Sequence, residues 1–298
     1  MRRTWIATAA VAAALVAPPP SHAVTVALES EPVVAVVVTA SPGERNRIQL
    51  SEDINGLHVE DSNPMVAGPG CRANEDNSVS CPDPTGSVRV LRVALGDGDD
   101  SVGSGFDERL FTFLSGGAGD DVLQSSGTSP TEFTGGAGDD VMRGGLGHDV
   151  FLEGRSSNGS ELIEGDRYAS SPPSKRYRDV VSYRGRTRGV SVDLDGNRDD
   201  GEPGEHDQVA PDIDSILGGR GADRLVGNAG SNFIKGGLGA DLLIGRGGRD
   251  QLFGGPGDDV IRSRDGRREP VLCGAGLDSV FADRLEALTL GCERRLRA

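Results

Sequence analysis

The sequence predicts an all-β fold in which short strands stack into a parallel roll with a thin core. Five contiguous nine-residue units fill residues 218–262, each with glycine first and fourth, Asp or Asn sixth, and Leu or Ile eighth. The composition agrees, because 45 glycines and only 36% hydrophobic residues suit a solenoid better than two globular cores. Composition alone would also fit a disordered chain, but the regular spacing of Leu and Ile favours a folded roll.

Each unit encodes a tight turn followed by a short strand. The glycines let the backbone adopt turn conformations that a Cβ disfavours. One turn and one strand make half a coil, so two nine-residue units complete a coil and every second unit stacks on the same edge, about 4.8 Å apart. The middle residue of each strand is expected to point inward and form the core: Leu225, Ile234, Leu243, Leu252 and Ile261.

The turns supply oxygen ligands for a metal ion. The carboxylate at position six and the carbonyl groups exposed by the turn are hard donors, and Ca²⁺ takes about six to eight such ligands. An ion between two stacked turns would use the sixth-position Asp of each. The predicted ligands of this block are the acids and the first and fourth glycines: Asp223, Asp241, Asp250, Asp259, Gly218, Gly221, Gly236, Gly239, Gly254 and Gly257.

The same spacing makes the two edges of the roll unequal. One edge carries Asp223, Asp241 and Asp259, whereas the other carries Asn232 and Asp250, followed by Arg268 where an acid is expected. We therefore expect calcium to bind well on the first edge and poorly on the second. The alternative, glycine-rich loops with solvated acids, explains neither the period nor the inward hydrophobic residues.

The pattern, best seen in GGLGADLLI from Gly236 and GGPGDDVIR from Gly254, resembles the GGxGxDxUx repeat of the RTX (repeats-in-toxin, hemolysin-type) calcium-binding family. The resemblance covers roughly residues 95–281 and implies a parallel β-roll with calcium in its turns. Members of the family often carry a separate catalytic domain, but residues 24–94 are short and rich in strand formers. The family usually has an uncleaved C-terminal export signal, and here an N-terminal signal favours the general secretory route.

The first 23 residues are typical of a secretory signal peptide, with Arg2 and Arg3, an apolar run over 5–17, and a small-x-Ala cleavage site ending at Ala23. The run is too short to span a bilayer, and a retained membrane anchor is the less favoured alternative. Removing this segment leaves 29 Lys and Arg against 46 Asp and Glu, a net charge of about −17. Such acidity disfavours nucleic-acid and anionic-membrane partners and suits cations. We predict a secreted, extracellular protein without a membrane span.

Four cysteines in an exported chain suggest disulfides. Cys71 and Cys81 flank a short polar loop, and Cys273 and Cys292 bracket the C-terminal segment. The sequence leaves the connectivity open, and we expect pairing within each of these local pairs. Zinc is disfavoured because the four histidines are scattered without ligand spacing.

Ahead of the tandem block, strand-type runs are expected at 33–39, 47–50, 57–59 and 87–95, and a first calcium block follows. Asp100, Asp121 and Asp140 are 21 and 19 residues apart, one coil plus a small loop each, so they should share one edge. Glu161 could continue that edge, and Asp149 lies on the opposite one. The turn glycines predicted as ligands here are Gly116, Gly119, Gly135 and Gly138.

The remaining segments are less regular. Residues 166–177 are predicted to form an inserted surface loop. The acidic run 193–207 is either a solvated loop or an additional weak calcium site, and Asp278 should stack on Asp259 in a last degenerate unit. The predicted organisation is a signal peptide at 1–23, a β-strand cap with a disulfide loop at 24–94, a first calcium block at 95–152, an irregular region with inserted loops at 153–217, the main tandem block at 218–262, and a degenerate repeat with a disulfide-stapled cap at 263–298.

No catalytic motif stands out, since the chain has neither H-E-x-x-H nor G-x-S-x-G. We therefore expect a secreted, non-enzymatic calcium-binding protein whose roll folds on binding extracellular calcium. Its role would be a scaffold or a surface or matrix interaction module, with extracellular polysaccharide or surface proteins as candidate partners besides calcium. The alternative is a calcium-stabilised enzyme that modifies extracellular polysaccharide as a lyase, hydrolase or epimerase.

Overall fold

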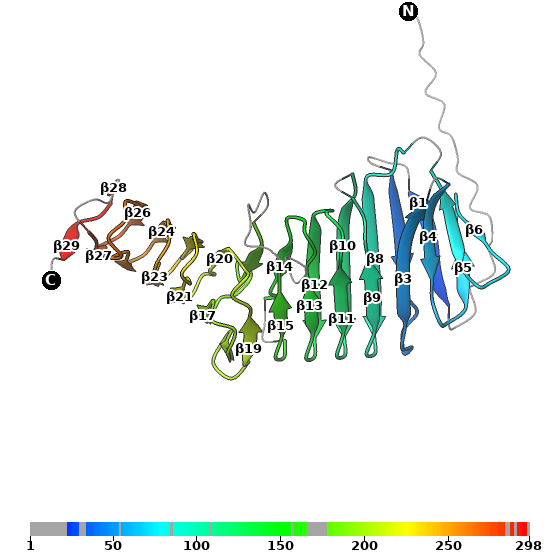
Figure 1. The fold of residues 1–298 in the computed structure, drawn as a ribbon. Coiled ribbons are helices and arrows are strands. Elements are labelled where there is room, and N and C mark those ends of the chain that lie inside the picture. The colour runs from blue at the N-terminus through cyan, green and yellow to red at the C-terminus, as the bar shows by residue number, and fades with distance from the viewer. Residues whose placement is uncertain are drawn as a thin grey trace, which may run out of the picture.

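The computed structural model describes residues 23–29, 34–53, 55–83, 86–107, 109–155, 158–165, 178–283, 287–288 and 291–296. All its regular elements are β-strands, stacked into an elongated roll with the N-terminal strands at one end and the last strand at the other (Figure 1). In this part of the chain, no helix is long and apolar enough to cross a membrane. The predicted signal peptide, apart from Ala23, and the predicted loop at 166–177 lie outside the described residues.

One sheet, the long sheet, runs the whole length of the roll. Its neighbours pair in parallel from β2 onward, while β1 and β2 pair antiparallel. In spatial order its thirteen strands are β5 (Met65–Ala67), β1 (Val24–Glu29), β2 (Ala35–Thr39), β8 (Val90–Asp97), β10 (Phe111–Ala118), β12 (Thr131–Ala137), β14 (Val150–Leu152), β16 (Val180–Ser182), β20 (Ser215–Leu217), β22 (Phe233–Lys235), β24 (Gln251–Pro256), β26 (Pro270–Ala275) and β28 (Ala287–Leu288).

Two shorter sheets follow one another on the other side of the core. The N-terminal sheet contains β6 (Arg72–Ala73), β7 (Val79–Pro82), β4 (Gly56–Glu60), β3 (Arg47–Asp53), β9 (Ser101–Ser104), β11 (Val122–Ser125), β13 (Val141–Arg143), β15 (Leu162–Glu164), β19 (Asp207–Val209) and β18 (Arg198–Asp200). The C-terminal sheet contains β17 (Ser191–Asp193), β21 (Arg224–Val226), β23 (Leu242–Ile244), β25 (Val260–Arg262), β27 (Ser279–Phe281) and β29 (Arg294–Leu296).

The chain alternates between the long sheet and the shorter sheets, so each pair of strands makes one coil. In the tandem block Phe233 pairs with Gln251 on the long sheet and Leu242 pairs with Val260 on the C-terminal sheet. Both registers are 18 residues, which is the coil length that two nine-residue units predict. The prediction of a parallel β-roll is confirmed.

The core is a file of side chains one residue deep. The five predicted inward residues of the tandem block are all completely buried, which confirms their orientation. In the N-terminal half the file includes Phe133 and Phe151, whose rings stack with centroids 4.9 Å apart. Burial of one large apolar side chain per strand contributes about 1.5–3 kcal/mol each, so a thin core gains its stability from repetition.

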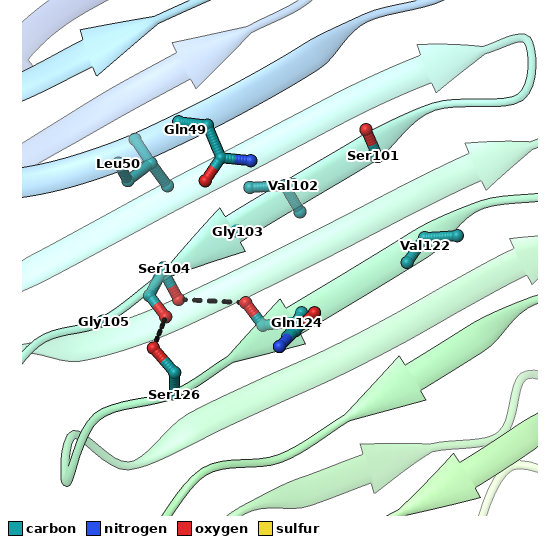
Figure 2. A pocket seen from close by; sticks show the side chains of 10 residues that line it. All are labelled: Gln49, Leu50, Ser101, Val102, Gly103, Ser104, Gly105, Val122, Gln124 and Ser126. Carbon is teal, nitrogen blue, oxygen red and sulfur yellow. Dashed lines mark hydrogen bonds between the residues drawn. The ribbon is translucent and has the colours of Figure 1, made fainter.

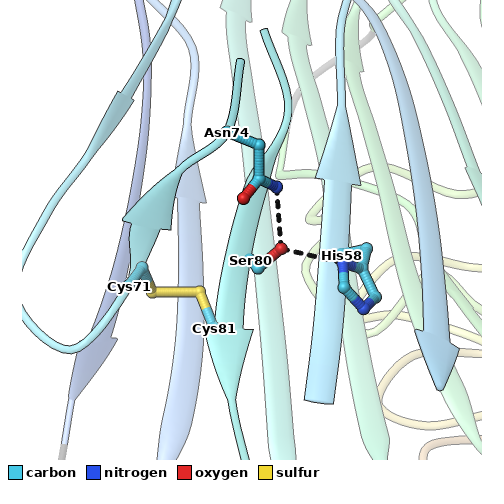
Figure 3. Close-up of a disulfide and its surroundings, with 5 residues drawn as sticks. All are labelled: His58, Cys71, Asn74, Ser80 and Cys81. Carbon is cyan, nitrogen blue, oxygen red and sulfur yellow. Dashed lines mark hydrogen bonds between the residues drawn. A yellow bond between two sulfur atoms is a disulfide. The ribbon is translucent and has the colours of Figure 1, made fainter. Parts of the chain in front are cut away.

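Antiparallel strands close the N-terminal end of the roll. β3, β4, β7 and β6 form an antiparallel ribbon, and β3 also pairs in parallel with β9. Cys71 and Cys81 join the ribbon by a disulfide, beside a hydrogen-bonded chain of Asn74, Ser80 and His58 (Figure 3). Together with the bond between Cys273 and Cys292, it confirms the expected local pairing.

The two shorter sheets meet at an excursion between β16 and β20. Here β17 begins the C-terminal sheet, whereas β18 and β19 pair antiparallel and end the N-terminal sheet. The expectation of a solvated loop over 193–207 is wrong for four of its acids, Asp200, Glu202, Glu205 and Asp207, which are all buried. They are buried because the excursion folds back onto the roll, where Glu205 meets the buried Arg186.

Candidate metal centres in the stacked turns

Acidic residues form ladders along the edges of the roll. Each of them immediately precedes a strand, and the carboxylate of one coil accepts the backbone N–H of the equivalent residue in the coil before it. The C-terminal ladder consists of Asp223, Asp241, Asp259, Asp278 and Glu293, joined by N–H to carboxylate distances of 2.9, 2.9, 2.8 and 2.9 Å. The structure thus aligns the four aspartates that the spacing places on one edge.

The N-terminal ladder brings together Asp100, Asp121 and Asp140, again in the expected register, with N–H to Oδ1 distances of 2.9 Å at both steps. Glu161 takes the next place, because Leu162 pairs with Val141. The expectation that Glu161 continues this edge is confirmed for its backbone position, although neither of its carboxylate oxygens accepts a hydrogen bond. Asp207 Oδ1 accepts the Glu161 N–H at 3.1 Å.

The long-sheet ladder includes Asp149, Asp179, Asp214, Asn232 and Asp250. The residue that follows Asp250 in this ladder is not basic. The expectation that Arg268 follows Asp250 is wrong, because Glu269 accepts the Asp250 N–H at 3.0 Å. Strands β24 and β26 are offset by 19 residues rather than 18, so one additional residue before β26 moves the acid into place. Asn232 remains the uncharged member of this ladder.

Many ladder aspartates have one carboxylate oxygen without a hydrogen bond. The Oδ2 atoms of seven ladder aspartates are buried and have no hydrogen-bond partner: Asp100, Asp121, Asp140, Asp241, Asp250, Asp259 and Asp278. In two others the same atom accepts the N–H of a turn glycine, Gly219 for Asp223 and Gly145 for Asp149. A buried carboxylate oxygen without a donor costs several kcal/mol when it is charged, so this arrangement fits a cation.

The first glycine of a unit opens the space that such a cation needs. A Cβ added to Gly236 would lie 2.3 Å from Asp241 Oδ2 and 2.7 Å from the carbonyl oxygen of Gly254 in the next coil. At Gly116 the corresponding distances are 2.2 Å to Asp121 Oδ2 and 2.6 Å to the Gly135 oxygen. A carboxylate oxygen of one turn and a carbonyl oxygen of the next therefore converge on the same space, and this all-oxygen donor set suits Ca²⁺.

Comparison with known families decides what the turns are. The model of the RTX calcium-binding nonapeptide repeat matches the chain four times, at residues 113–127, 132–151, 211–243 and 236–267.

The chain carries RTX-type calcium-binding repeats.

The matched segments contain the RTX turns of Asp121, Asp140, Asp223, Asp241 and Asp259, and Ca²⁺ is the ion that these repeats bind. Asp100 and Asp278 extend the same ladders beyond the matches. A comparison with curated proteins gives no match.

Burial in the RTX turns perturbs the ladder carboxyl groups. Desolvation raises the pKa of Asp121, Asp250 and Asp259 to about 7 and that of Asp140 and Asp241 to about 6. Backbone N–H donors from the neighbouring coil oppose this rise, and nearby carboxylates add to it in Asp121 and Asp259. A bound cation would reverse the shift, because an adjacent positive charge favours the ionised carboxylate.

Sequence reasoning missed several ladder members, namely Asp207, Asp214, Glu269 and Glu293. The first three share a local signal that does not need the glycine turn. In each, an acid is followed two residues later by a fully buried aliphatic residue, Val209, Ile216 or Val271. An acid placed two positions before an inward residue would have identified them where the nonapeptide is degenerate.

Proposed function

We propose that this protein is a secreted, non-enzymatic scaffold whose RTX roll folds when it binds extracellular calcium. The buried, unpartnered Oδ2 atoms of the ladder aspartates carry the proposal. Without a cation, folding desolvates these carboxylates and stacks them one coil apart, as with Asp241 and Asp259. Calcium in the turns offsets that cost only in the folded state, so its binding free energy becomes folding free energy.

Several features support an extracellular location. Each disulfide joins a strand residue, Cys81 of β7 or Cys273 of β26, to a cysteine outside the strands, and such bonds persist in oxidising compartments. The N-terminal segment has the pattern of a secretory signal. A chain exported unfolded would then meet its calcium outside the cell, which would delay folding until after transport.

The outer surface supports an interaction role. A hollow on the N-terminal sheet is lined by residues of β3, β9 and β11 and of the segments that follow β9 and β11, and its polar members are Gln49, Ser101, Ser104, Gln124 and Ser126 (Figure 2). Amide and hydroxyl groups can form hydrogen bonds with a polysaccharide or a surface protein. The ten residues that line this hollow include no Asp, Glu, His or Cys.

The experiment is a calcium titration of residues 24–298 followed by far-UV circular dichroism. We expect little β-signal in chelator and a cooperative gain at millimolar calcium, with magnesium far less effective because its smaller octahedral shell fits flexible carbonyl cages poorly. A complete β-signal in chelator that calcium leaves unchanged would refute calcium-driven folding. Calcium-dependent cleavage or epimerisation of acidic polysaccharides would overturn the non-enzymatic assignment.

A further inference from the structure

Three buried carboxylates meet inside the roll, away from the RTX turns. Glu153 follows β14 on the long sheet, Glu161 precedes β15, and Asp207 begins β19. One carboxylate oxygen from each lies within 4.8 Å of the other two. Glu161 and Asp207 are completely buried and Glu153 is 3% exposed. We call these three residues the junction cluster, because they lie where the N-terminal sheet gives way to the C-terminal one.

The nearby Arg186 does not neutralise this cluster. Its guanidinium is also completely buried. It lies 2.6 Å from Glu205, 3.4 Å from Glu153 and 3.5 Å from Glu202. Its one charge is therefore shared among three carboxylates, two of them outside the cluster. Within the described part of the chain, neither Glu161 nor Asp207 forms a salt bridge, so negative charge remains in excess.

Glu161 provides a second, independent indication of a ligand. Both of its carboxylate oxygens are buried and accept no hydrogen bond, and Glu153 Oε1 is likewise unpartnered. Asp207, in contrast, is held in place, since its Oδ1 accepts the Glu161 N–H at 3.1 Å and its Oδ2 accepts the Tyr183 hydroxyl at 3.2 Å. A fixed carboxylate beside two carboxylates with free oxygens is a preorganised cation site.

We propose that Glu153, Glu161 and Asp207 bind a divalent cation, Ca²⁺, at a structural site distinct from the RTX turns. The donors are all carboxylate oxygens, and such a donor set favours hard cations over transition metals. Two oxygens bound to one calcium ion at about 2.4 Å can be at most about 4.8 Å apart, and the three cluster oxygens lie within that limit. Three carboxylates less a fraction of the Arg186 charge leave an excess of negative charge for the ion to balance.

The site would fasten the junction of the two shorter sheets. Its ligands come from β14, β15 and β19, so one ion would join the long sheet to the N-terminal sheet and hold the β17–β19 excursion against both. Without the ion, the cluster must hold protons instead, because burial raises the pKa of Glu161 to about 11 and that of Glu153 to about 7. Cation and proton are thus the two competing occupants.

Terbium luminescence distinguishes this site from the RTX turns. Tb³⁺ replaces Ca²⁺ at oxygen sites, and an ion bound by Asp207 lies beside the Tyr183 ring, which can transfer excitation energy to it. In the chain of residues 24–298 we expect tyrosine-sensitised emission that calcium displaces. Tyr183→Phe and Glu161→Gln should each abolish most of it. Asp259→Asn, which alters a distant RTX turn, should retain it while weakening the calcium response of the β-signal.

Two further measurements keep the proposal falsifiable. The double variant Tyr168→Phe/Tyr177→Phe leaves Tyr183 as the remaining tyrosine of residues 24–298 and should keep the emission. If Glu161→Gln fails to fold at saturating calcium, Glu153→Gln decides instead, since it removes a ligand and keeps the shape of the side chain. Emission that is equal in the wild type and in the folded glutamine variants would overturn the proposal and assign the cluster to protons. The circular dichroism response to calcium tests the RTX turns independently of this emission result.

Discussion

Asp241→Asn tests the ladder mechanism sharply, because this carboxylate lies between two RTX turns. Its Oδ1 accepts the Asp223 N–H at 2.9 Å, and its buried Oδ2 has no donor and converges with the Gly254 carbonyl on one space. Asparagine has nearly the same shape and keeps an oxygen for the ladder hydrogen bond. The substitution therefore removes the charge of the ligand without removing the coil-to-coil contact.

The expected cost follows from the two spaces that Asp241 serves, one toward Asp223 and one toward Asp259. Even an outer-shell partner of a metal contributes about 10- to 100-fold in affinity, so a direct charged ligand contributes at least about tenfold per site. Tenfold corresponds to about 1.4 kcal/mol. At saturating calcium, two weakened sites lower the free energy of unfolding by about 3 kcal/mol, because binding free energy adds to the stability of the folded state.

The assay is urea unfolding at fixed calcium, together with the calcium midpoint of the β-signal. Asn232→Ala is the matched control, since this uncharged residue of the long-sheet ladder accepts only the Asn228 N–H through its Oδ1, at 2.9 Å. We expect it to lose about 1 kcal/mol with little change in the calcium midpoint. An unchanged midpoint in Asp241→Asn, or an equal shift in both variants, would refute the reasoning.

Three other perturbations follow from the same geometry. Asn232→Asp adds a carboxylate beside Asp250 and should shift the calcium midpoint to lower concentration in the same titration, and a shift to higher concentration would contradict the ladder. Gly237→Ala puts a Cβ 2.2 Å from the Gly219 carbonyl oxygen at φ +119°, so it should lower the free energy of unfolding by more than about 3 kcal/mol. Gly266→Ala is the control, because nothing lies within 4 Å of its Cβ, and it should cost about 1 kcal/mol. Equal losses in the two variants would argue against crowding. In chelator, acidification from pH 7.5 to pH 5 should increase the β-signal. The folded pKa of Asp259 is raised by burial to about 7 from 3.8, so the folded state binds protons more tightly and this stabilisation is lost as pH rises through 7; a signal that falls on acidification would be inconsistent with buried, unpaired carboxylates.

The nonapeptide period was sufficient to predict the coil and its ladders. Two units per coil place Asp223 over Asp241 and turn Leu243 inward, because strand pairing and the alternation of side chains leave no other register. The disulfide partners were predictable for a related reason. Cys71 and Cys81 flank a short loop, and Cys273 and Cys292 lie one coil apart, 19 residues in sequence.

Prediction failed where the period is interrupted. A single additional residue before β26 replaces Arg268 by Glu269 in the ladder, and a fixed spacing cannot reveal which loop has absorbed it. The sequence around Glu205 also does not indicate that this residue is buried. Its burial depends on Arg186, which lies 19 residues away in sequence and contacts Glu205 only because of the way the excursion folds. Tertiary pairing of this kind cannot be read from composition or charge runs.

We propose that calcium in the ladders folds the roll, and amide hydrogen exchange with and without calcium tests this. The N–H groups of Asp100, Asp121, Asp223, Asp241 and Asp259 each donate to a carboxylate of the next coil. The account predicts slow exchange in peptides that span 100–140 and 223–278 at millimolar calcium, and fast exchange in both regions in chelator at neutral pH. Equal protection of these peptides with and without calcium would contradict it.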